Sequence, residues 1–332
     1  MIRARITGVG RYVPPRVVTN HDLEKMMDTS DQWIRERSGI VERHWVDEHT
    51  ATSDLAVEAA KIALENAGKK PEEVDFIIFA TLSPDYFFPG GGVLLQDKLG
   101  MPPVGALDVR NQCSGFMYAL STADAFVRSG VYKTILVVGA EVQSKGLNLT
   151  TEGRDVAVLF GDGAGAVVVE AFEGDETQGI LTTHLHSQGK YATYLWTEAP
   201  GSAHKHHITH ELIDEGRTFP KMKGRDVFKH SVVRFPEVIL EALNAIHASI
   251  DDVDLVIPHQ ANLRISEAMR QRLGLPPEKV YNNIQRYGNT TAATIPIALS
   301  EVLEQGLLKE GDLLILAAFG SGFTWASAAI RW

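Results

Sequence analysis

Cysteine is nearly absent from this chain: Cys113 is the only one in 332 residues, so no intrachain disulfide can form. Long hydrophobic runs are absent as well, because the longest apolar stretches, such as residues 313–319, fall far short of the ~20 residues needed to span a bilayer. Residues 1–8 lack the apolar stretch of a secretory signal peptide. We therefore expect a cytoplasmic protein without a membrane segment.

Positive charge is in short supply. The chain carries 32 lysines and arginines against 42 aspartates and glutamates, which gives a formal net charge of −10. Nucleic-acid binding needs a dense positive surface, so we expect no nucleic-acid partner, although an acidic protein could dock on a local basic patch. Apolar residues make up 44% of the sequence, enough for the core of one large α/β unit or of two packed halves.

The order of apolar segments predicts an α/β protein. Short apolar runs rich in β-branched residues predict buried strands at residues 75–80, 134–139, 164–169, 255–257 and 313–317. Apolar residues at helical spacing predict helices at residues 53–67, 116–129, 227–247, 262–273 and 294–305. Buried strands that alternate with helices are typical of layered α/β folds.

A weak internal duplication indicates two related halves. The segments around Gly130 and Gly306 each join the end of a helix to a buried strand. Cys113 stands 17 residues before Gly130, and Asn289 stands 17 residues before Gly306. We therefore predict that Cys113 and Asn289 are pseudo-symmetric and that each opens the central helix of its half. Two such helices that meet at an approximate twofold axis would bring both side chains into one cleft.

Cys113 stands in the segment NQCSGF, where a strand pattern gives way to a helix pattern. A thiol at the first turn of a helix faces unpaired N–H groups and the positive end of the helix dipole, which favour the thiolate and lower its pKa. This placement predicts a nucleophile. The alternative is a buried cysteine that acts only as a small hydrophobic residue.

His259 and Asn289 complete a set of side chains suited to acyl transfer. His259 closely follows the predicted strand at 255–257, at the carboxyl end where open α/β sheets bind ligands. Asn289 lies in a glycine-prefaced turn into a helix, where the alternative is a simple helix cap. A thiolate, an imidazole and an amide donor together predict chemistry through a thioester.

Other histidines are poorer candidates. His204, His206, His207 and His210 crowd one polar segment. Acidic partners and a closed ligand geometry are not evident there, so we expect a solvated loop and no metal site.

Six segments of the chain carry the motifs of a known family. They are TSDQWIRERSGI (29–40), CSGF (113–116), FGDGAGA (160–166), HQANLRI (259–265), GNT (288–290) and FGSGFTW (319–325). In this order and at this spacing, they make the chain resemble the β-ketoacyl-acyl-carrier-protein synthase III family nearly from end to end. The resemblance implies an α/β, thiolase-like, five-layered αβαβα fold of two pseudo-symmetric halves, which we place at residues 1–172 and 173–332.

The resemblance also implies a reaction. Cys113 would take an acyl group from acyl-CoA, while the backbone N–H groups of Cys113 and Ser321 would form the oxyanion hole. His259 and Asn289, as neutral donors, would bind the thioester carbonyl of malonyl-acyl-carrier protein, and loss of CO₂ would leave an enolate that attacks the acyl-enzyme. The product would be the β-ketoacyl-acyl-carrier protein that starts fatty acid synthesis. This reaction requires no metal or redox cofactor.

The family pattern further implies a CoA site at Thr29, Trp33, Arg37 and Arg154. The indole of Trp33 would stack on adenine, and the guanidinium groups would bind phosphate through paired donors. Without the resemblance, Trp33 would be read as a core residue and the arginines as solvated surface charges.

The same pattern implies a protein partner. Arg225, Lys229 and Arg264 match the rim of the substrate tunnel in the family, where they would dock an acidic carrier protein. The alternative is a solvated basic face, to which Arg272 would also belong. The family is usually homodimeric, so we expect a second copy of the chain as a partner.

The sequence departs from the commonest family pattern near the expected acyl pocket. Gln112 precedes the nucleophile where a small residue is usual, and residues 85–92 are richer in glycine and aromatic residues. Phe88, in that segment, matches the position that reaches across the dimer into the acyl pocket of the neighbour. With Phe160 and Phe319, Gln112 and Phe88 form the expected acyl pocket. We expect this pocket to accept more than acetyl.

Two rival functions share some of these features. An enzyme of secondary metabolism that joins two acyl chains, or transfers an acyl group without decarboxylation, would carry the same three side chains. Release of CO₂ separates condensation from simple transfer. Papain-like hydrolases also place Cys, His and Asn in this chain order, but their signature around the cysteine is absent here.

Overall fold

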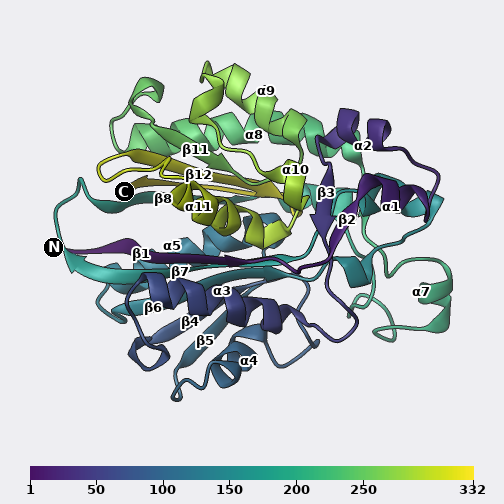
Figure 1. Cartoon of the computed structure of the whole chain (residues 1–332), viewed down its shortest axis with the longest axis horizontal. Helices are drawn as coiled ribbons and strands as arrows, with labels where there is room; N and C mark the ends of the chain where they lie inside the picture. Colours follow the sequence, from purple (N-terminus) through teal and green to yellow (C-terminus); the bar gives the residue numbers. More distant parts are fainter.

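The computed structural model describes all 332 residues, which build two main β-sheets (Figure 1). The first sheet has five strands in the order β1-β7-β6-β4-β5. These strands are β1 (Ile2–Tyr12), β7 (Gly163–Glu173), β6 (Thr134–Glu141), β4 (Phe76–Ala80) and β5 (Gly105–Val109). The second sheet has four strands in the order β11-β12-β13-β8. They are β11 (Leu255–Pro258), β12 (Leu313–Gly320), β13 (Thr324–Arg331) and β8 (Gly179–Ser187).

Both sheets mix parallel and antiparallel ladders. β4 pairs in parallel with β5 and β6, and β11 pairs in parallel with β12, whereas the other pairs are antiparallel. Every residue of β6 and of β12 is buried. Central strands of this kind need cover on both faces, so each sheet must lie between layers of helices.

Helices supply that cover in three layers (Figure 1). The helices α5 (Gly115–Arg128) and α11 (Thr294–Glu304) lie between the sheets, and one core of 29 buried residues joins them to both. Two pairs of outer helices cover the remaining faces. They are α3 (Thr52–Asn66) and α4 (Gly91–Lys98) on the first sheet, and α8 (Gly224–Ala245) and α9 (Leu263–Leu273) on the second. The result is the five-layered αβαβα, thiolase-like fold that the resemblance implies.

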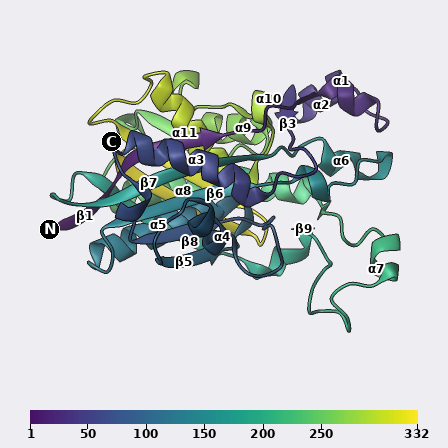
Figure 2. The ribbon, with the colours of Figure 1, turned by 60° about the horizontal axis from the view of Figure 1, so that its bottom comes forward.

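Most of the short elements lie at one end of these layers (Figure 2). They are β2 (Val17–Thr19), α1 (Asn20–Glu24), α2 (Asp31–Ser38), β3 (Glu42–His44), α6 (Arg154–Ala157), β9 (Leu195–Trp196), α7 (His210–Asp214), β10 (Lys221–Met222) and α10 (Ile284–Tyr287). The segment that carries α7 extends away from the layers. None of the helices combines the length and apolarity that a membrane crossing requires.

The predicted elements are present. Observed helix ends differ from the predicted ones by three residues at most, as where 227–247 is observed as Gly224–Ala245. Within the five layers the prediction missed β1, β5, β8, β13 and α4, and it also missed the short elements outside them, α2 among these. Several of these strands lie at sheet edges or carry exposed residues, so their sequences lack the continuous apolar run of a central strand.

The two central helices begin alike but not at the residues that the spacing predicted. A 3₁₀ turn precedes each, Gln112–Ser114 before α5 and Thr291–Ala293 before α11, and the first residue of each turn has a positive φ, 44° and 54°. By this criterion the counterpart of Cys113 is Ala292. The predicted equivalence with Asn289 is wrong by three residues, because α11 has 11 residues where α5 has 14.

Candidate active site

Cys113 stands in the 3₁₀ turn between the end of β5 and the start of α5, and it is 6% exposed. The end of β12 packs against it closely. A Cβ atom added to Gly320 would lie 2.5 Å from Cβ and 3.1 Å from Sγ of Cys113. Only glycine therefore fits at residue 320, and the thiol lies where the end of β12, in the second sheet, packs against the turn before α5.

The charge state of Cys113 differs from the prediction. Burial raises the pKa of the thiol to about 12, and the negative charge of Glu141 adds to the rise. The backbone N–H groups of Ser321 and of Cys113 itself favour the thiolate and oppose this shift in pKa, but their effect is smaller. The predicted lowering of the pKa is wrong because removing water from the sulfur outweighs the helix terminus. A base must therefore take the thiol proton when the sulfur reacts.

His259 follows β11, and its ring is held by one hydrogen bond. Its backbone N–H donates to the carbonyl of Ala317 at 2.8 Å. The ring atom Nδ1 lies 2.6 Å from Oγ1 of Thr294, whereas Nε2 is buried and has no partner in the chain. Burial lowers the pKa of the imidazole to about 3, so the ring is neutral at neutral pH. Nε2 is thus available to a bound group.

Asn289 is fixed through its backbone and through one end of its amide. Its N–H donates to the carbonyl of Leu159 at 2.8 Å, and its Oδ1 accepts the N–H of Thr291 at 2.8 Å. The Nδ2 group makes no hydrogen bond within the chain, although the residue is only 5% exposed. With its oxygen occupied, this amide presents donors to whatever binds beside it.

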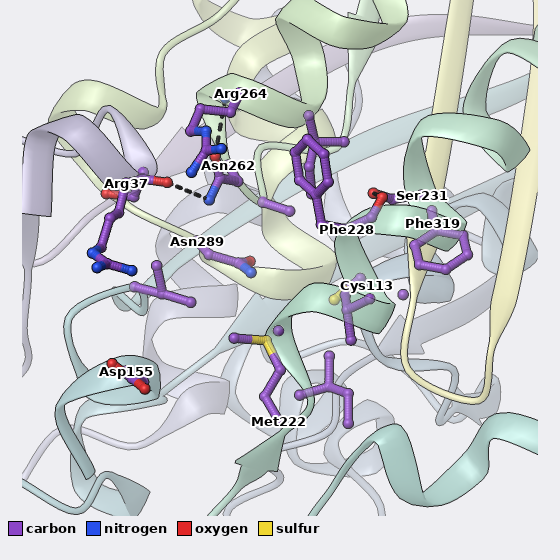
Figure 3. A pocket seen from close by; sticks show the side chains of 18 of the residues that line it. Arg37, Cys113, Asp155, Met222, Phe228, Ser231, Asn262, Arg264, Asn289 and Phe319 are labelled. Atoms are coloured by element: carbon purple, nitrogen blue, oxygen red, sulfur yellow. Dashed lines mark hydrogen bonds between the residues drawn. The ribbon is translucent and has the colours of Figure 1, made fainter. Parts of the chain in front are cut away.

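One cavity of about 460 Å³ connects these groups. Cys113, His259 and Asn289 all line it, together with Phe160 and Phe319. Figure 3 shows the side chains of Asn289 and Cys113 directed toward the same space. The structure thus brings together the three side chains that the sequence singled out. Their arrangement offers a thiol, a neutral ring nitrogen and an amide donor to a single thioester.

Comparison with known proteins identifies the family. A protein from Xanthomonas campestris named beta-ketoacyl-[acyl-carrier-protein] synthase III is 48% identical over 331 residues, which cover 100% of this chain and 99% of that protein. The chain belongs to the β-ketoacyl-[acyl-carrier-protein] synthase III family. A protein of the same name from Caldanaerobacter subterraneus is 46% identical over 331 residues, which cover 100% of this chain and 98% of that protein.

Sequence models of the family and a solved structure agree with this assignment. The model described as 3-oxoacyl-[acyl-carrier-protein (ACP)] synthase III matches residues 107–189, and the model of its C-terminal part matches residues 243–332. The crystal structure of 3-oxoacyl-[acyl-carrier-protein] synthase III from Aquifex aeolicus superposes with a TM-score of 0.90 at 43% identity and covers 99% of this chain and 100% of that chain. The protein is therefore a condensing acyltransferase of the synthase III family.

In this family member, the residues expected to bind CoA gather near the mouth of the cavity. Trp33 and Arg37 line it. The guanidinium of Arg37 lies 4.5 Å from the centre of the Trp33 ring, and that of Arg154 lies 5.3 Å from it. Thr29 does not line the cavity, and its hydroxyl is buried without a partner. Two cations beside one aromatic ring suit a ligand with phosphates and a purine.

The residues expected to dock a carrier protein are all exposed. Arg225 and Lys229 lie on α8, and Arg264 lies on α9 with its guanidinium 5.5 Å from the ring of Phe228. Arg225 and Arg264 line the cavity, whereas Lys229 does not. The side of the mouth formed by α8 and α9 is therefore basic.

Two of the four residues expected in the acyl pocket do not line the cavity. Phe88 is 80% exposed in the turn between β4 and α4. Gln112 is also absent from the lining, whereas Phe160 and Phe319 belong to it. The expectation that Gln112 and Phe88 line the acyl pocket is therefore not met within the single chain, since Phe88 points to solvent and Gln112 lies outside the lining.

The histidine-rich segment lies apart from the cavity. His206 and His207 are exposed, in agreement with the solvated loop predicted there, whereas His210, also exposed, begins the helix α7. Nε2 of His204 lies 3.9 Å from a carboxylate oxygen of Glu198. No three His, Cys, Asp or Glu side chains of the chain are grouped so that they could hold a metal ion.

A buried carboxyl that the sequence analysis missed lies beneath the site. Glu141 ends the fully buried strand β6 and accepts the backbone N–H groups of Leu82 and Ser83 at 3.2 Å and of Ala292 at 3.4 Å. Burial raises the pKa of Glu141 to about 7. Its bonds tie the end of β4 to the turn before α11. A single acidic residue at the end of an otherwise apolar strand is the signal that could have identified it.

Proposed function

We propose that the protein loads an acyl group from acyl-CoA onto Cys113 and condenses it with malonyl-acyl-carrier protein. The products are CoA, CO₂ and the β-ketoacyl-acyl-carrier protein that starts fatty acid synthesis. The cavity shared by Cys113, His259 and Asn289 is the observation that carries this proposal. Side chains and backbone amides supply the nucleophile, the base and the donors, so the reaction uses no metal or redox cofactor.

In the first half-reaction, the sulfur of Cys113 attacks the thioester carbonyl while Nε2 of His259 accepts the thiol proton. As the carbon–sulfur bond to CoA breaks, this proton passes to the CoA sulfur. The backbone N–H groups of Cys113 and Ser321 stabilise the oxyanion. The position of Ser321, directly after Gly320, whose backbone packs against Cys113, supports this role.

In the second half-reaction, the malonyl thioester carbonyl binds between Asn289 and His259. Loss of CO₂ leaves an enolate, whose oxygen receives a hydrogen bond from Nδ2 of Asn289. The enolate carbon attacks the acyl group, and Cys113 departs as a thiolate. The overall reaction consumes one proton. In this step the neutral ring of His259 holds its proton on Nε2 and donates a hydrogen bond to the enolate oxygen, and the departing thiolate of Cys113 takes the consumed proton from solvent.

Binding of both substrates involves the basic rim of the cavity. Trp33, Arg37, Arg154 and Thr29 hold CoA, with the indole against adenine and the guanidinium groups against phosphate. The position of Trp33 and Arg37 at the cavity supports this assignment. The malonyl group arrives on a carrier protein.

The carrier protein docks on the exposed cations Arg225, Lys229 and Arg264. Acyl-carrier proteins present acidic surfaces, and complementary charge guides such an encounter and fixes its orientation. The exposure of all three side chains beside the cavity supports this assignment. The net charge of −10 makes a local basic patch the necessary site of contact for an acidic protein.

The assembly that we propose is a cytoplasmic homodimer of chains whose halves are residues 1–172 and 173–332. β5 lies at the edge of its sheet, and Tyr86, Phe87 and Phe88 are 62%, 65% and 80% exposed. An open strand edge and a group of exposed aromatic side chains favour burial against a second copy. Phe88 would then complete the acyl pocket of the partner, which accepts chains longer than acetyl.

Intact-mass measurement after mixing with acetyl-, butyryl- and octanoyl-CoA tests these assignments. We expect an acyl mass increase that Cys113→Ala abolishes and that malonyl-acyl-carrier protein discharges with release of CO₂. Discharge without CO₂ would instead support simple acyl transfer. A chain that takes no acyl group from any of these thioesters would overturn the proposal. Acetyl strongly preferred over the longer chains would overturn the pocket assignment alone.

A further inference from the structure

The ring of His259 is oriented by a hydroxyl that has no place in the reaction described above. Thr294 is the first residue of α11 and is 2% exposed. Its Oγ1 lies 2.6 Å from Nδ1 of His259 and 3.1 Å from the carbonyl oxygen of Thr291, to which it donates. The hydroxyl of Thr294 thus contacts both the ring of His259 and the carbonyl of Thr291. The only protons available to these two contacts are that of the hydroxyl and any proton on Nδ1.

Only one placement of protons satisfies both contacts at once. A carbonyl oxygen is an acceptor only, so the contact with Thr291 requires the proton of the Thr294 hydroxyl. Oγ1 must then act as the acceptor toward His259, and Nδ1 must carry a proton. The other placement would point Oγ1–H at Nδ1 and leave the carbonyl of Thr291 without this donor, at a cost in a buried environment.

The proton on Nδ1 determines what the other ring nitrogen can do. Burial keeps the ring neutral, and a neutral imidazole holds a single N–H. With that proton on Nδ1, Nε2 has a free lone pair. Nε2 is also the ring atom that is buried and has no partner in the chain. The resting ring therefore offers an acceptor to the cavity, whereas the sequence analysis expected His259 to act as a neutral donor.

We propose that Thr294 is a positioning residue that fixes His259 in the Nδ1–H tautomer, so that Nε2 can accept the thiol proton of Cys113. This inference rests on the proposed function, in which His259 is the base for acylation. The thiol needs such a base because it is protonated at neutral pH. In this step the S–H bond of Cys113 breaks and an N–H bond forms at Nε2. The proton then passes to the sulfur of CoA, which leaves as a thiol.

The two half-reactions depend on this tautomer differently. Acylation requires a lone pair on Nε2, which the bond to Thr294 secures. Condensation requires a proton on Nε2, so that His259 can donate to the enolate oxygen beside Asn289. Loss of the Thr294 hydroxyl removes the acceptor of Nδ1–H and lets the ring adopt the Nε2–H form. We therefore expect acylation to suffer and condensation to be spared.

Thr294→Val and Thr294→Ser separate this role from packing. Valine keeps the shape of threonine without the hydroxyl, and serine keeps the hydroxyl without the methyl group. Acylation is measured by rapid quench and intact mass, and condensation is measured as a single turnover of enzyme that is already fully acylated. We expect Thr294→Val to slow acylation about tenfold, the effect of losing one buried hydrogen bond, and to change condensation less than about threefold. Thr294→Ser should match the wild-type protein in both.

Nitrogen NMR of ¹⁵N-histidine-labelled protein reads the tautomer directly. The signals of His259 are those that vanish in His259→Gln, which separates them from the other 11 of the 12 histidines. In the wild-type protein and in Thr294→Ser, we expect a protonated Nδ1 and a bare Nε2. In Thr294→Val, the Nε2–H form should gain population.

Two results would overturn the inference. One is a resting His259 with its proton on Nε2. The other is Thr294→Val with an unchanged tautomer and with both half-reactions at wild-type rates or slowed equally. If the wild-type protein takes no acyl group, the proposed function fails instead, and the NMR comparison still decides whether Thr294 sets the tautomer.

Discussion

The side-chain oxygen of Asn289 accepts the backbone N–H of Thr291 at 2.8 Å, and this bond decides which end of the amide faces the cavity. The oxygen is held inside the turn before α11, so the Nδ2 donors are left for a ligand. An amide that could rotate freely would offer its oxygen half of the time and repel an enolate. The Thr291 bond therefore preorganises the donor.

Asn289→Asp keeps the acceptor for Thr291 and removes the donor. A second carboxylate oxygen would then face the enolate, so we expect condensation to fall by at least about 100-fold, the range found when one oxyanion donor is lost. Acylation of Cys113 should fall less than about tenfold, because it does not use this amide. The two rates are measured by rapid-quench intact mass and by release of CO₂. Condensation within tenfold of the wild-type rate would contradict the assigned role.

The burial of Cys113 predicts an unusual pH profile for its alkylation. Because burial raises the pKa of the thiol to about 12, the thiolate fraction keeps increasing throughout the accessible pH range. We expect the rate of reaction with iodoacetamide to rise with pH and to show no plateau up to about pH 10. Cys113 is the only cysteine, so the intact mass reports it alone, and Cys113→Ala should not react. A plateau near pH 8 would mean an activated thiolate in the resting enzyme.

The sequence was sufficient for the positions of Cys113, His259 and Asn289. Cys113 follows a change from strand to helix pattern, His259 follows the end of an apolar run, and Asn289 lies in a glycine-prefaced turn into a helix; these are local features. The layered arrangement could also be predicted, because the central strands and helices have a strong apolar pattern. The edge strand β5 escaped prediction because none of its residues is buried: each is exposed or only partly buried.

Other features depend on contacts between distant segments and could not be predicted. The pKa of Cys113 is set by burial, which no local pattern reveals. Thr294 lies 35 residues from His259, and the carboxyl of Glu141 reaches a backbone N–H 151 residues away. Phe88 is exposed in the single chain, so its expected role requires a second copy.

A buried relay positions the helix that carries the proposed CoA residues. Arg43 is fully buried and donates to Oδ1 of Asn20 at 2.8 Å, and Nδ2 of Asn20 donates to Oδ1 of Asp31 at 2.9 Å. Asp31 begins α2, which also carries Trp33 and Arg37. Asn20 therefore joins a buried cation to the first turn of this helix.

We expect Asn20→Ala to raise the KM for acyl-CoA about tenfold, because it leaves buried polar groups unpaired and frees the start of α2. The rate of acylation at saturating acyl-CoA should change less than about threefold, since the relay does not touch the thiol. Gln32→Ala is the matched control, because Gln32 lies on the same helix and bonds only to Glu36 at an exposed position. An unchanged KM for acyl-CoA in Asn20→Ala would show that the relay does not contribute to CoA binding.

The buried ring of His259 makes folding stability depend on pH in a defined window. Burial lowers its pKa from 6.5 to about 3, so between these values the unfolded chain binds a proton that the folded chain does not. Stability therefore falls as the pH falls through this window, by up to about 1.4 kcal/mol per pH unit. The raised pKa of Glu141, about 7, acts in the opposite direction, since the folded chain holds that proton longer.

Comparison with His259→Gln isolates the histidine, because Glu141 is present in both proteins. The free energy of unfolding is measured in urea between about pH 4 and pH 7. We expect it to change less steeply with pH in the variant than in the wild-type protein, and the difference should correspond to the uptake of one proton on unfolding. The two curves should run parallel above about pH 7, where the ring is neutral in both states. His206→Gln is the control, because His206 is exposed and its replacement should leave the slope unchanged. Parallel curves for His259→Gln and the wild-type protein across the whole range would show that the ring is not held neutral by burial.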